Sequence, residues 1–425
     1  MSIATSTFAI FDKPDHTTEV LNYTIVDYYP LSSVTSGGPI EFHVPGSAEE
    51  YIDVNDINLY IKFKVTKADG KDIDATDKVG LVNNGIATLF QDVSLTVGET
   101  QIEGGQNCYP YLGYFNSVMQ YSPEAQTSHM RAMGWHRDDA GKFDVEANSG
   151  FKRRSALIEG SKSAEIMGPL FLNFFRQEKY LISQTDMRIK FMPSKPDFAL
   201  NAFGTTDFKI QFEEVILYVP RAELNPSIIN GHAAGLRTQN AIYPINHSEV
   251  MTFTIPKGQK SYVKDRLFPD GAPKLLLVAM IDNEAYNGNI KKNPFNFQHF
   301  DLNKIALYKD GRSTPGRPLT PDFDKDMYLR DYLMTMRAFN YPNSDDTNGF
   351  TPQMFANGFT IYAYDLTSTR DVSSALQQPS MSKNLRLELY FEKDLPSTVN
   401  VLLYAVSDSN VQITRLRDVI PGYNR

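Results

Sequence analysis

The sequence predicts an all-β protein made of two tandem eight-stranded β jelly rolls, with a few short helices in loops. Apolar and polar residues alternate with period 2 from end to end, and the order of elements in the first half repeats in the second. The composition agrees, because the 23 Tyr and 27 Phe residues suit half-buried pleated surfaces and large contact areas.

The alternation of apolar and polar residues is the main strand signal. It is clearest in four stretches, 57–65, 93–97, 187–191 and 385–391. Each stretch has one apolar and one polar face, which is typical of sandwich strands with one side in water. Between Phe212 and Val215 the apolar parity switches, and this predicts a β-bulge near Glu213 and Glu214.

Helical patterns are few and short. Apolar residues have helical spacing at 111–121 behind Pro110, and Thr351-Pro352 with Gly358 predicts a short capped helix. A further helix is predicted at 227–237, near the middle of the chain. The longest pattern, 324–339, carries one apolar stripe, formed by Tyr328, Leu329, Tyr332, Leu333 and Met336.

The two halves repeat in the order of their elements, although their sequence identity is very low. The paired segments are 42–46 with 253–258, 57–65 with 275–281, 95–98 with 307–311, 111–121 with 324–339, 170–175 and 187–191 with 359–366 and 385–391, and 208–219 with 399–406. Jelly rolls are the common sandwich of this size in shells and lectins. The predicted division is an N-terminal arm at 1–28, a first jelly roll at 29–222, a linker at 223–240, a second jelly roll at 241–415 and a C-terminal tail at 416–425.

Charge and cysteine usage exclude several classes of protein. Lys and Arg number 42 against 50 Asp and Glu, a formal charge of -8, which argues against broad nucleic-acid binding. The densest basic group, 151–154, is predicted to be a solvated loop. A single cysteine, Cys108, excludes an intrachain disulfide and a Cys-rich zinc site.

The sequence also lacks signals for a membrane or for secretion. The first residues have no basic start followed by an apolar stretch. The longest apolar run, 275–281, is too short to cross a bilayer. We therefore expect a soluble protein made inside the cell, with no membrane span.

No catalytic, cofactor-binding or metal-binding residue is predicted, so the protein is expected not to be an enzyme and to need no cofactor. The densest group of possible ligands is His129 and His136 with Asp138 and Asp139, and we interpret it as a solvated loop. The sequence holds no phosphate loop and no nucleophile elbow. Cys108 is expected to pack near a helix start rather than to act as a nucleophile.

Short stretches over nearly the whole chain resemble one known family. They are 29–33, 37–46, 51–54, 59–62, 82–84, 109–111, 150–154, 292–297, 319–323, 356–359 and 384–389, with YPY at 109–111 and KNPF at 292–295. In this order they resemble the major capsid protein (hexon) of Maverick/Polinton elements and the related adintoviruses. No single motif is diagnostic, and the specificity lies in the order.

The resemblance implies a double jelly-roll capsid protein of the lineage shared with adenovirus hexons, virophages and large DNA viruses. In that lineage a homotrimer forms a pseudo-hexagonal capsomer, and trimers tile an icosahedral shell around double-stranded DNA. The implied partners are other copies of the chain, a penton protein and minor capsid proteins. The implied location is the virion, with assembly in the host nucleus or cytoplasm.

Three other interpretations remain open at this point. A jelly-roll protein that binds carbohydrate or a receptor would bind glycans as an isolated monomer. A β-sandwich glycoside hydrolase would need two carboxylates at the right separation in a cleft. A domesticated, transposon-derived capsid-like protein of a host genome would keep the fold and serve a different use.

Overall fold

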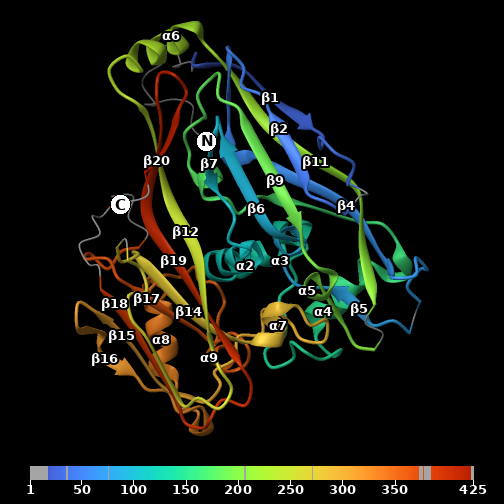
Figure 1. Ribbon diagram of the computed structural model, residues 1–425, viewed down its shortest axis with the longest axis vertical. Coiled ribbons are helices and arrows are strands. Elements are labelled where there is room, and N and C mark those ends of the chain that lie inside the picture. Colours follow the sequence, from blue (N-terminus) through green and yellow to red (C-terminus); the bar gives the residue numbers. More distant parts are fainter. Residues whose placement is uncertain are drawn as a thin grey trace, which may run out of the picture.

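Two β sandwiches lie side by side in the protein (Figure 1). The computed structural model describes residues 18–34, 37–74, 76–204, 207–269, 271–372, 377 and 384–422. Residues 1–17 of the predicted arm and residues 423–425 of the predicted tail lie outside the described residues. We call the sandwich that ends with β11 roll 1, and the one that begins with β12 roll 2.

Roll 1 consists of two four-stranded antiparallel sheets with short additions. The first has the order β1 (Val20–Tyr28), β11 (Phe208–Leu224), β4 (Asn58–Lys67) and β8 (Ala164–Pro169). The second has the order β2 (Ile40–Val44), β9 (Met187–Pro193), β6 (Phe90–Val97) and β7 (Thr100–Glu103). When the eight strands are lettered B to I along the chain, the sheets read B–I–D–G and C–H–E–F.

Roll 2 has the same two sheets. The first has the order β12 (Ala241–Ile255), β19 (Val399–Ile413), β14 (Leu275–Asp282) and β17 (Ile361–Asp365). The second has the order β13 (Ser261–Lys264), β18 (Leu385–Phe391), β15 (Leu302–Lys309) and β16 (Arg312–Leu319). These are again B–I–D–G and C–H–E–F. Two jelly rolls of identical connectivity confirm the predicted fold class.

The remaining elements are short. The extra strands are β3 (Glu50–Ile52), β5 (Val79–Leu81), β10 (Leu200–Ala202) and β20 (Val419–Gly422). The α-helices are α1 (Gly85–Thr88), α2 (Tyr109–Gln120), α3 (Pro123–Thr127), α4 (Ser149–Ala156), α5 (Pro196–Ala199), α6 (Pro226–Gly235), α7 (Asn283–Asn287), α8 (Leu329–Arg337) and α9 (Pro352–Ala356). Helix α6 joins the two rolls. Within the described residues, no helix is long and apolar enough to cross a membrane.

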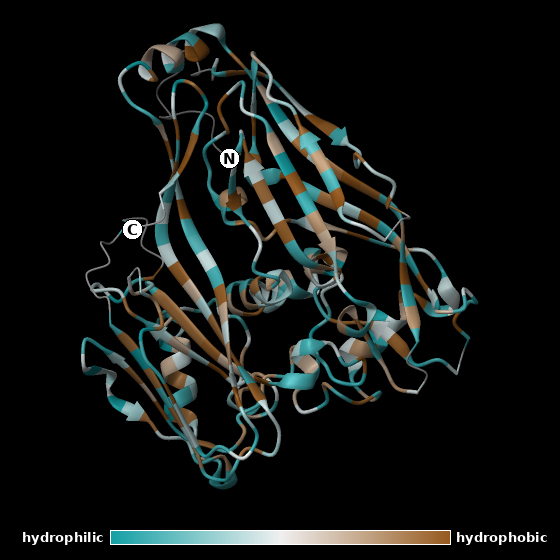
Figure 2. Ribbon diagram, viewed as in Figure 1, coloured by the Kyte–Doolittle hydropathy of each residue, from teal (hydrophilic) through white to brown (hydrophobic). Residues whose placement is uncertain are grey.

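The strands follow the alternation of the sequence, which Figure 2 shows as alternating colours along the ribbons. In β4, Leu59, Ile61, Phe63 and Val65 are fully buried, while the residues between them, at 60, 62 and 64, are partly exposed. Pairing between β11 and β4 skips one residue after Phe212, which confirms the predicted bulge. The helix predicted after Pro352 is also confirmed, since the Thr351 side chain accepts a hydrogen bond from the amide of Met354.

The strands differ from the predictions at two domain boundaries and in two of the paired segments. Residues 20–28 are strand B of roll 1 rather than part of an arm, and β20 pairs with β19 where a tail is predicted. The segment 42–46 overlaps the end of strand C, whereas 253–255 ends strand B, so these two are not equivalent. Segment 170–175 follows strand G instead of forming it. The other paired segments fall on equivalent strands or helices.

Candidate functional site

The described residues hold no group of His, Cys, Asp and Glu that could bind a metal ion. A cavity of about 50 Å³ lies between the rolls, lined by residues that include Glu103, Cys108 and His247. Ligand pockets usually have several hundred Å³, so this one is too small for a sugar or a cofactor. Cys108 lies buried just before α2, as predicted, and burial raises the pKa of its thiol.

Larger hollows among the described residues are open to solvent. One, of about 550 Å³, lies over β18 and includes Asp265 and Glu388. Both carboxylates pair with the same guanidinium, that of Arg386, at 3.5 Å and 2.6 Å. A glycosidase needs one protonated and one ionised carboxyl across a bond. This arrangement therefore does not favour the hydrolase alternative.

The basic group 151–154 is not the solvated loop that the sequence predicts. It forms part of α4, whose first turn is capped by the side chain of Asn148. Arg154 points inward, with 1% of its side chain exposed, while Lys152 and Arg153 remain exposed. The prediction is wrong because three adjacent residues on a helix point in different directions. Only Arg154 points into the protein interior.

Arg154 is the centre of a buried polar network. Its Nε donates to the carbonyl of Leu81 at 2.7 Å, and a second guanidinium nitrogen donates to the carbonyl of His136. A third lies 2.5 Å from the carboxylate of Asp138, whose side chain is fully buried. Buried charges are tolerated only when paired and hydrogen-bonded in this way.

The predicted loop at 129–139 is thus partly structural. Asp138 also accepts hydrogen bonds from Asn148 at 2.7 Å and from Asn293 of roll 2 at 3.3 Å. Burial, reinforced by the charge of Arg154, lowers the pKa of His136 to about 4. Its ring is neutral at pH 7. The interpretation of Asp138 as a solvated residue is therefore wrong, and its role is to link α4 to roll 2.

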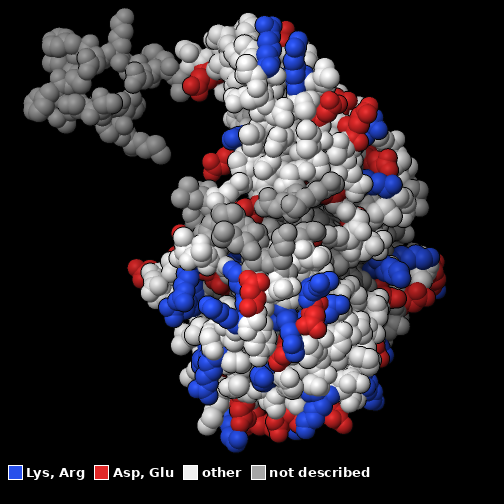
Figure 3. Space-filling view, turned by 60° about the vertical axis from the view of Figure 1, so that its left-hand side comes forward, with Lys and Arg blue, Asp and Glu red and all other residues white. Residues whose placement is uncertain are grey.

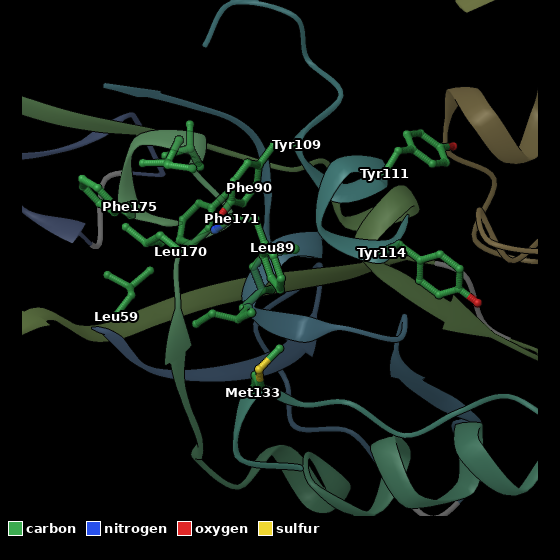
Figure 4. Packing of buried hydrophobic residues seen from close by; sticks show 14 of the residues in the cluster. Leu59, Leu89, Phe90, Tyr109, Tyr111, Tyr114, Met133, Leu170, Phe171 and Phe175 are labelled. Atoms are coloured by element: carbon green, nitrogen blue, oxygen red, sulfur yellow. Dashed lines mark hydrogen bonds between the residues drawn. The ribbon is translucent and has the colours of Figure 1, made fainter. Parts of the chain in front are cut away.

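The two rolls share a continuous aromatic interface. Tyr114 of α2 stacks on Phe295 of roll 2 with ring centres 3.9 Å apart, and Phe115 stacks on Phe297 at 5.3 Å. In Figure 4, Tyr111 and Tyr114 project from α2 away from Leu59, Leu89 and Phe90 in the core of roll 1. Such stacked pairs add stability beyond the area they bury.

Polar side chains fix the register of this interface. Asn173 and Ser248 exchange two hydrogen bonds between the rolls, from Nδ2 to the serine carbonyl at 3.2 Å and from the serine amide to Oδ1 at 3.0 Å. The Tyr404 hydroxyl donates to Asn116 Oδ1 at 3.4 Å and lies 3.2 Å from the Ser248 hydroxyl. All four residues are buried. The interface therefore resembles a domain core rather than a hinge.

The B–I–D–G sheet of roll 2 is buried on both faces. In β14, one set of alternate residues packs into roll 2 and the other packs toward roll 1. The first set is Leu276, Val278 and Met280, and the second is Leu275, Leu277, Ala279 and Ile281. A strand covered on both faces reads as a continuous apolar run, which explains the run at 275–281.

The equivalent sheet of roll 1 has one face that stays partly exposed among the residues that the structure describes. Val215, Leu217 and Val219 of β11 pack inward, so Ile216 and Tyr218 lie on the opposite face, where Ile216 is buried at 7% exposed and Tyr218 is partly exposed. Cross-strand pairing places Tyr60 and Met167 in one row with Ile216. Strand β1 at the edge adds Tyr23 and Ile25, which are 42% and 58% exposed. We call Tyr23, Ile25, Tyr60, Met167, Ile216 and Tyr218 the outer face of roll 1.

A second exposed apolar surface lies at α8. The sequence predicts one apolar stripe at 324–339, and the structure buries only part of it. Tyr328 and Met336 are buried, whereas Leu329 and Leu333 are 57% and 53% exposed and Met327 before them is 65% exposed. We call Met327, Leu329 and Leu333 the α8 stripe. Exposed apolar surface in such a contiguous group usually marks an interaction site.

Charges do not form a single-sign field on the side that Figure 3 brings forward. Lys and Arg are interspersed there with Asp and Glu, most densely over the lower half of the molecule, where roll 2 lies. Nucleic-acid surfaces usually gather basic residues into one patch or stripe. This side of the molecule therefore lacks the electrostatic footprint of such a surface.

Asp331, on the buried side of α8, makes stability depend on pH. Burial raises the pKa of its carboxyl to about 6 from 3.8. Between these values the folded chain keeps a proton that the unfolded chain loses, so stability falls as pH rises from about 4 to about 6. We expect the free energy of unfolding of Asp331→Asn, relative to that of the parent protein, to rise by about 1–2 kcal/mol between pH 4 and pH 7. The free energy of unfolding of both proteins would be measured from pH 4 to pH 7. The same dependence on pH in the two proteins would contradict this expectation.

The fold and these surfaces define a double jelly-roll protein. No protein-family model matches the chain. An uncharacterized protein of Caenorhabditis elegans is 23% identical over 396 residues, which cover 90% of this chain and 93% of that protein.

Several solved structures share the whole fold. A chain of the Sputnik virophage has a TM-score of 0.65 and 12% identity, over 99% of this chain and 93% of that chain. The Faustovirus major capsid protein has a TM-score of 0.60 and 8% identity, over 95% and 92%. The mavirus major capsid protein has a TM-score of 0.56 and 10% identity, over 99% and 93%. At these identities the likeness establishes the fold.

Proposed function

We propose that this chain is a viral major capsid protein without enzymatic activity. Three copies would form a pseudo-hexagonal capsomer, and capsomers would tile an icosahedral shell around double-stranded DNA. The observation that carries the proposal is the fusion of two rolls of identical connectivity through a buried aromatic interface. Three such pairs supply six similar sandwiches, which is the number that a hexagonal unit needs.

The finer parts of the proposal rest on the family resemblance. They are membership of the Maverick/Polinton and adintovirus lineage, a hexon role in the virion, and contacts with penton and minor capsid proteins. The boundaries of the rolls are proposed from the strands, with β1 assigned to the first roll and β20 to the second. Helix α6 then lies in the linker between them.

The solution mass of the purified chain tests the trimer. Light scattering at near-physiological salt is expected to give 144 kDa, three times the chain mass of 48.0 kDa. Hexagonal particles of that mass by electron microscopy would support a capsomer. A strict monomer at tens of micromolar would overturn the trimeric capsomer and favour a monomeric binding protein.

A second candidate is a domesticated capsid-like protein encoded by an animal genome. The similarity to a Caenorhabditis elegans protein over most of both chains favours this candidate. Both candidates predict the same trimer, so the discriminating measurement is nuclease-protected DNA in particles from expressing cells. Protected DNA that encodes the chain supports a virion, and particles without DNA support the domesticated protein.

A further inference from the structure

The two rolls carry equivalent helices that differ in what covers them. Helix α2 lies between strands F and G of roll 1, and α8 lies between strands F and G of roll 2. Helix α2 packs on the outer face of the B–I–D–G sheet of roll 2, where its Phe115 contacts Tyr404 of strand I at 5.5 Å between ring centres. Helix α8 has no such sheet beneath its stripe, which stays exposed among the described residues.

The sheet faces show the complementary difference. Strand I of roll 2 presents Tyr404 to roll 1, where it is 1% exposed. Strand I of roll 1 presents Tyr218 on its outer face, and that side chain is only partly buried. Both sheets therefore carry an outward tyrosine on strand I, but the face in roll 2 is buried and the face in roll 1 stays partly exposed among the described residues.

The chemistry of the two uncovered surfaces matches. The α8 stripe is aliphatic, and exposed Arg337 continues it one turn beyond Leu333. The outer face of roll 1 is apolar at Ile25 and Met167, and the neighbouring row carries Glu165 and Glu214 on either side of Lys62. An apolar centre with opposite charges at its rim is typical of a protein interface.

We propose that the α8 stripe of one copy packs on the outer face of roll 1 in a second copy of this chain. The contact would repeat between copies what α2 and the roll 2 sheet do within one chain. It deepens the proposed trimer and rests on it. Because the two surfaces differ, the contact is heterologous, and repeated by a threefold axis it closes a ring.

Two charged variants test this contact. Leu329→Glu with Leu333→Glu alters the stripe, and Ile25→Lys with Tyr218→Lys alters the outer face. Each pair of changes is expected to reduce the mass by light scattering from 144 kDa to the monomer value of 48.0 kDa. Leu416→Glu is the matched control, since Leu416 is 82% exposed and lies on neither surface, and it should stay trimeric. An unchanged circular dichroism spectrum and a cooperative thermal transition would show that each variant is folded.

Mixing the two variants distinguishes a heterologous contact from a symmetric one. Each variant retains one intact surface, so the mixture should form a complex of one copy of each and nothing larger. Its mass would be 96 kDa, twice 48.0 kDa. If α8 instead paired with α8, the outer-face variant alone would dimerise and the mixture would add nothing, and that result would overturn the inference.

The failure of this inference can be told from the failure of the proposed function. A trimeric parent whose two variants also remain trimeric would overturn only the contact through α8. A parent that stays monomeric would overturn the proposed capsomer.

Discussion

Replacing Arg154 with Met is expected to lower the free energy of unfolding by about 3–5 kcal/mol. The change removes one partner of a buried ion pair and leaves the carboxylate of Asp138 without a charge partner in the protein interior. It also leaves the carbonyls of Leu81 and His136 without this donor. Chemical unfolding followed by tryptophan fluorescence would measure the loss, because Trp135 is buried next to this network.

The neighbouring residue provides a matched control. Arg153→Met removes the same charge from the same helix, but Arg153 is exposed, so the expected change is within about 0.5 kcal/mol. Adding Asp138→Asn to Arg154→Met should recover part of the lost stability, because the second change removes the unpaired charge. Equal effects of Arg153→Met and Arg154→Met would contradict the buried network.

Replacing Phe295 with Ala is expected to cost about 3–5 kcal/mol, since it leaves a cavity under Tyr114 in the interface between the rolls. Phe295 is fully buried although it belongs to a loop rather than to a strand. The parent protein should unfold in one calorimetric transition because the rolls share this core. In the variant the weakened interface should separate the transitions of the two rolls.

A surface aromatic serves as the comparison for Phe295. Tyr29→Ala removes a ring that is 61% exposed and should leave a single transition at nearly the parent temperature. Two transitions in the parent protein itself would show that the rolls unfold independently. In that case the interface would contribute less than its packing indicates.

Local signals in the sequence are sufficient for the jelly-roll strands and several helices. Alternation at 57–65 places one apolar face in a core whatever the strand pairs with, and the parity switch near Glu213 marks the bulge. Pro352 and its neighbours begin and end α9 through backbone chemistry alone. Such features depend on residues next to one another, so one sequence is enough to predict them.

Features that depend on contacts between residues far apart in the chain cannot be predicted from local sequence patterns. Arg154 is buried because Leu81, His136 and Asp138 meet it from other parts of the chain, and nothing in 151–154 indicates this. Strand β1 is an edge strand whose apolar residues Leu21, Tyr23 and Ile25 are exposed, so its place in the sheet depends on pairing with the distant strand β11. For α8 the sequence does carry a signal of an exposed apolar surface. Its apolar stripe includes Leu329 and Leu333, and it is wider than the part of the helix that packs on β17.

The connection through α6 has a consequence for how assembly depends on protein concentration. Six separate rolls would have to meet to close a ring of six, and each junction would form by collision. Here one junction in every two already exists within a chain, and its formation does not depend on protein concentration. In the proposed trimer, the equilibrium concentration of closed rings would therefore scale with the third power of the free-chain concentration, whereas six separate rolls would give the sixth power. Synthesis of a single polypeptide would also keep the two kinds of roll in equal supply.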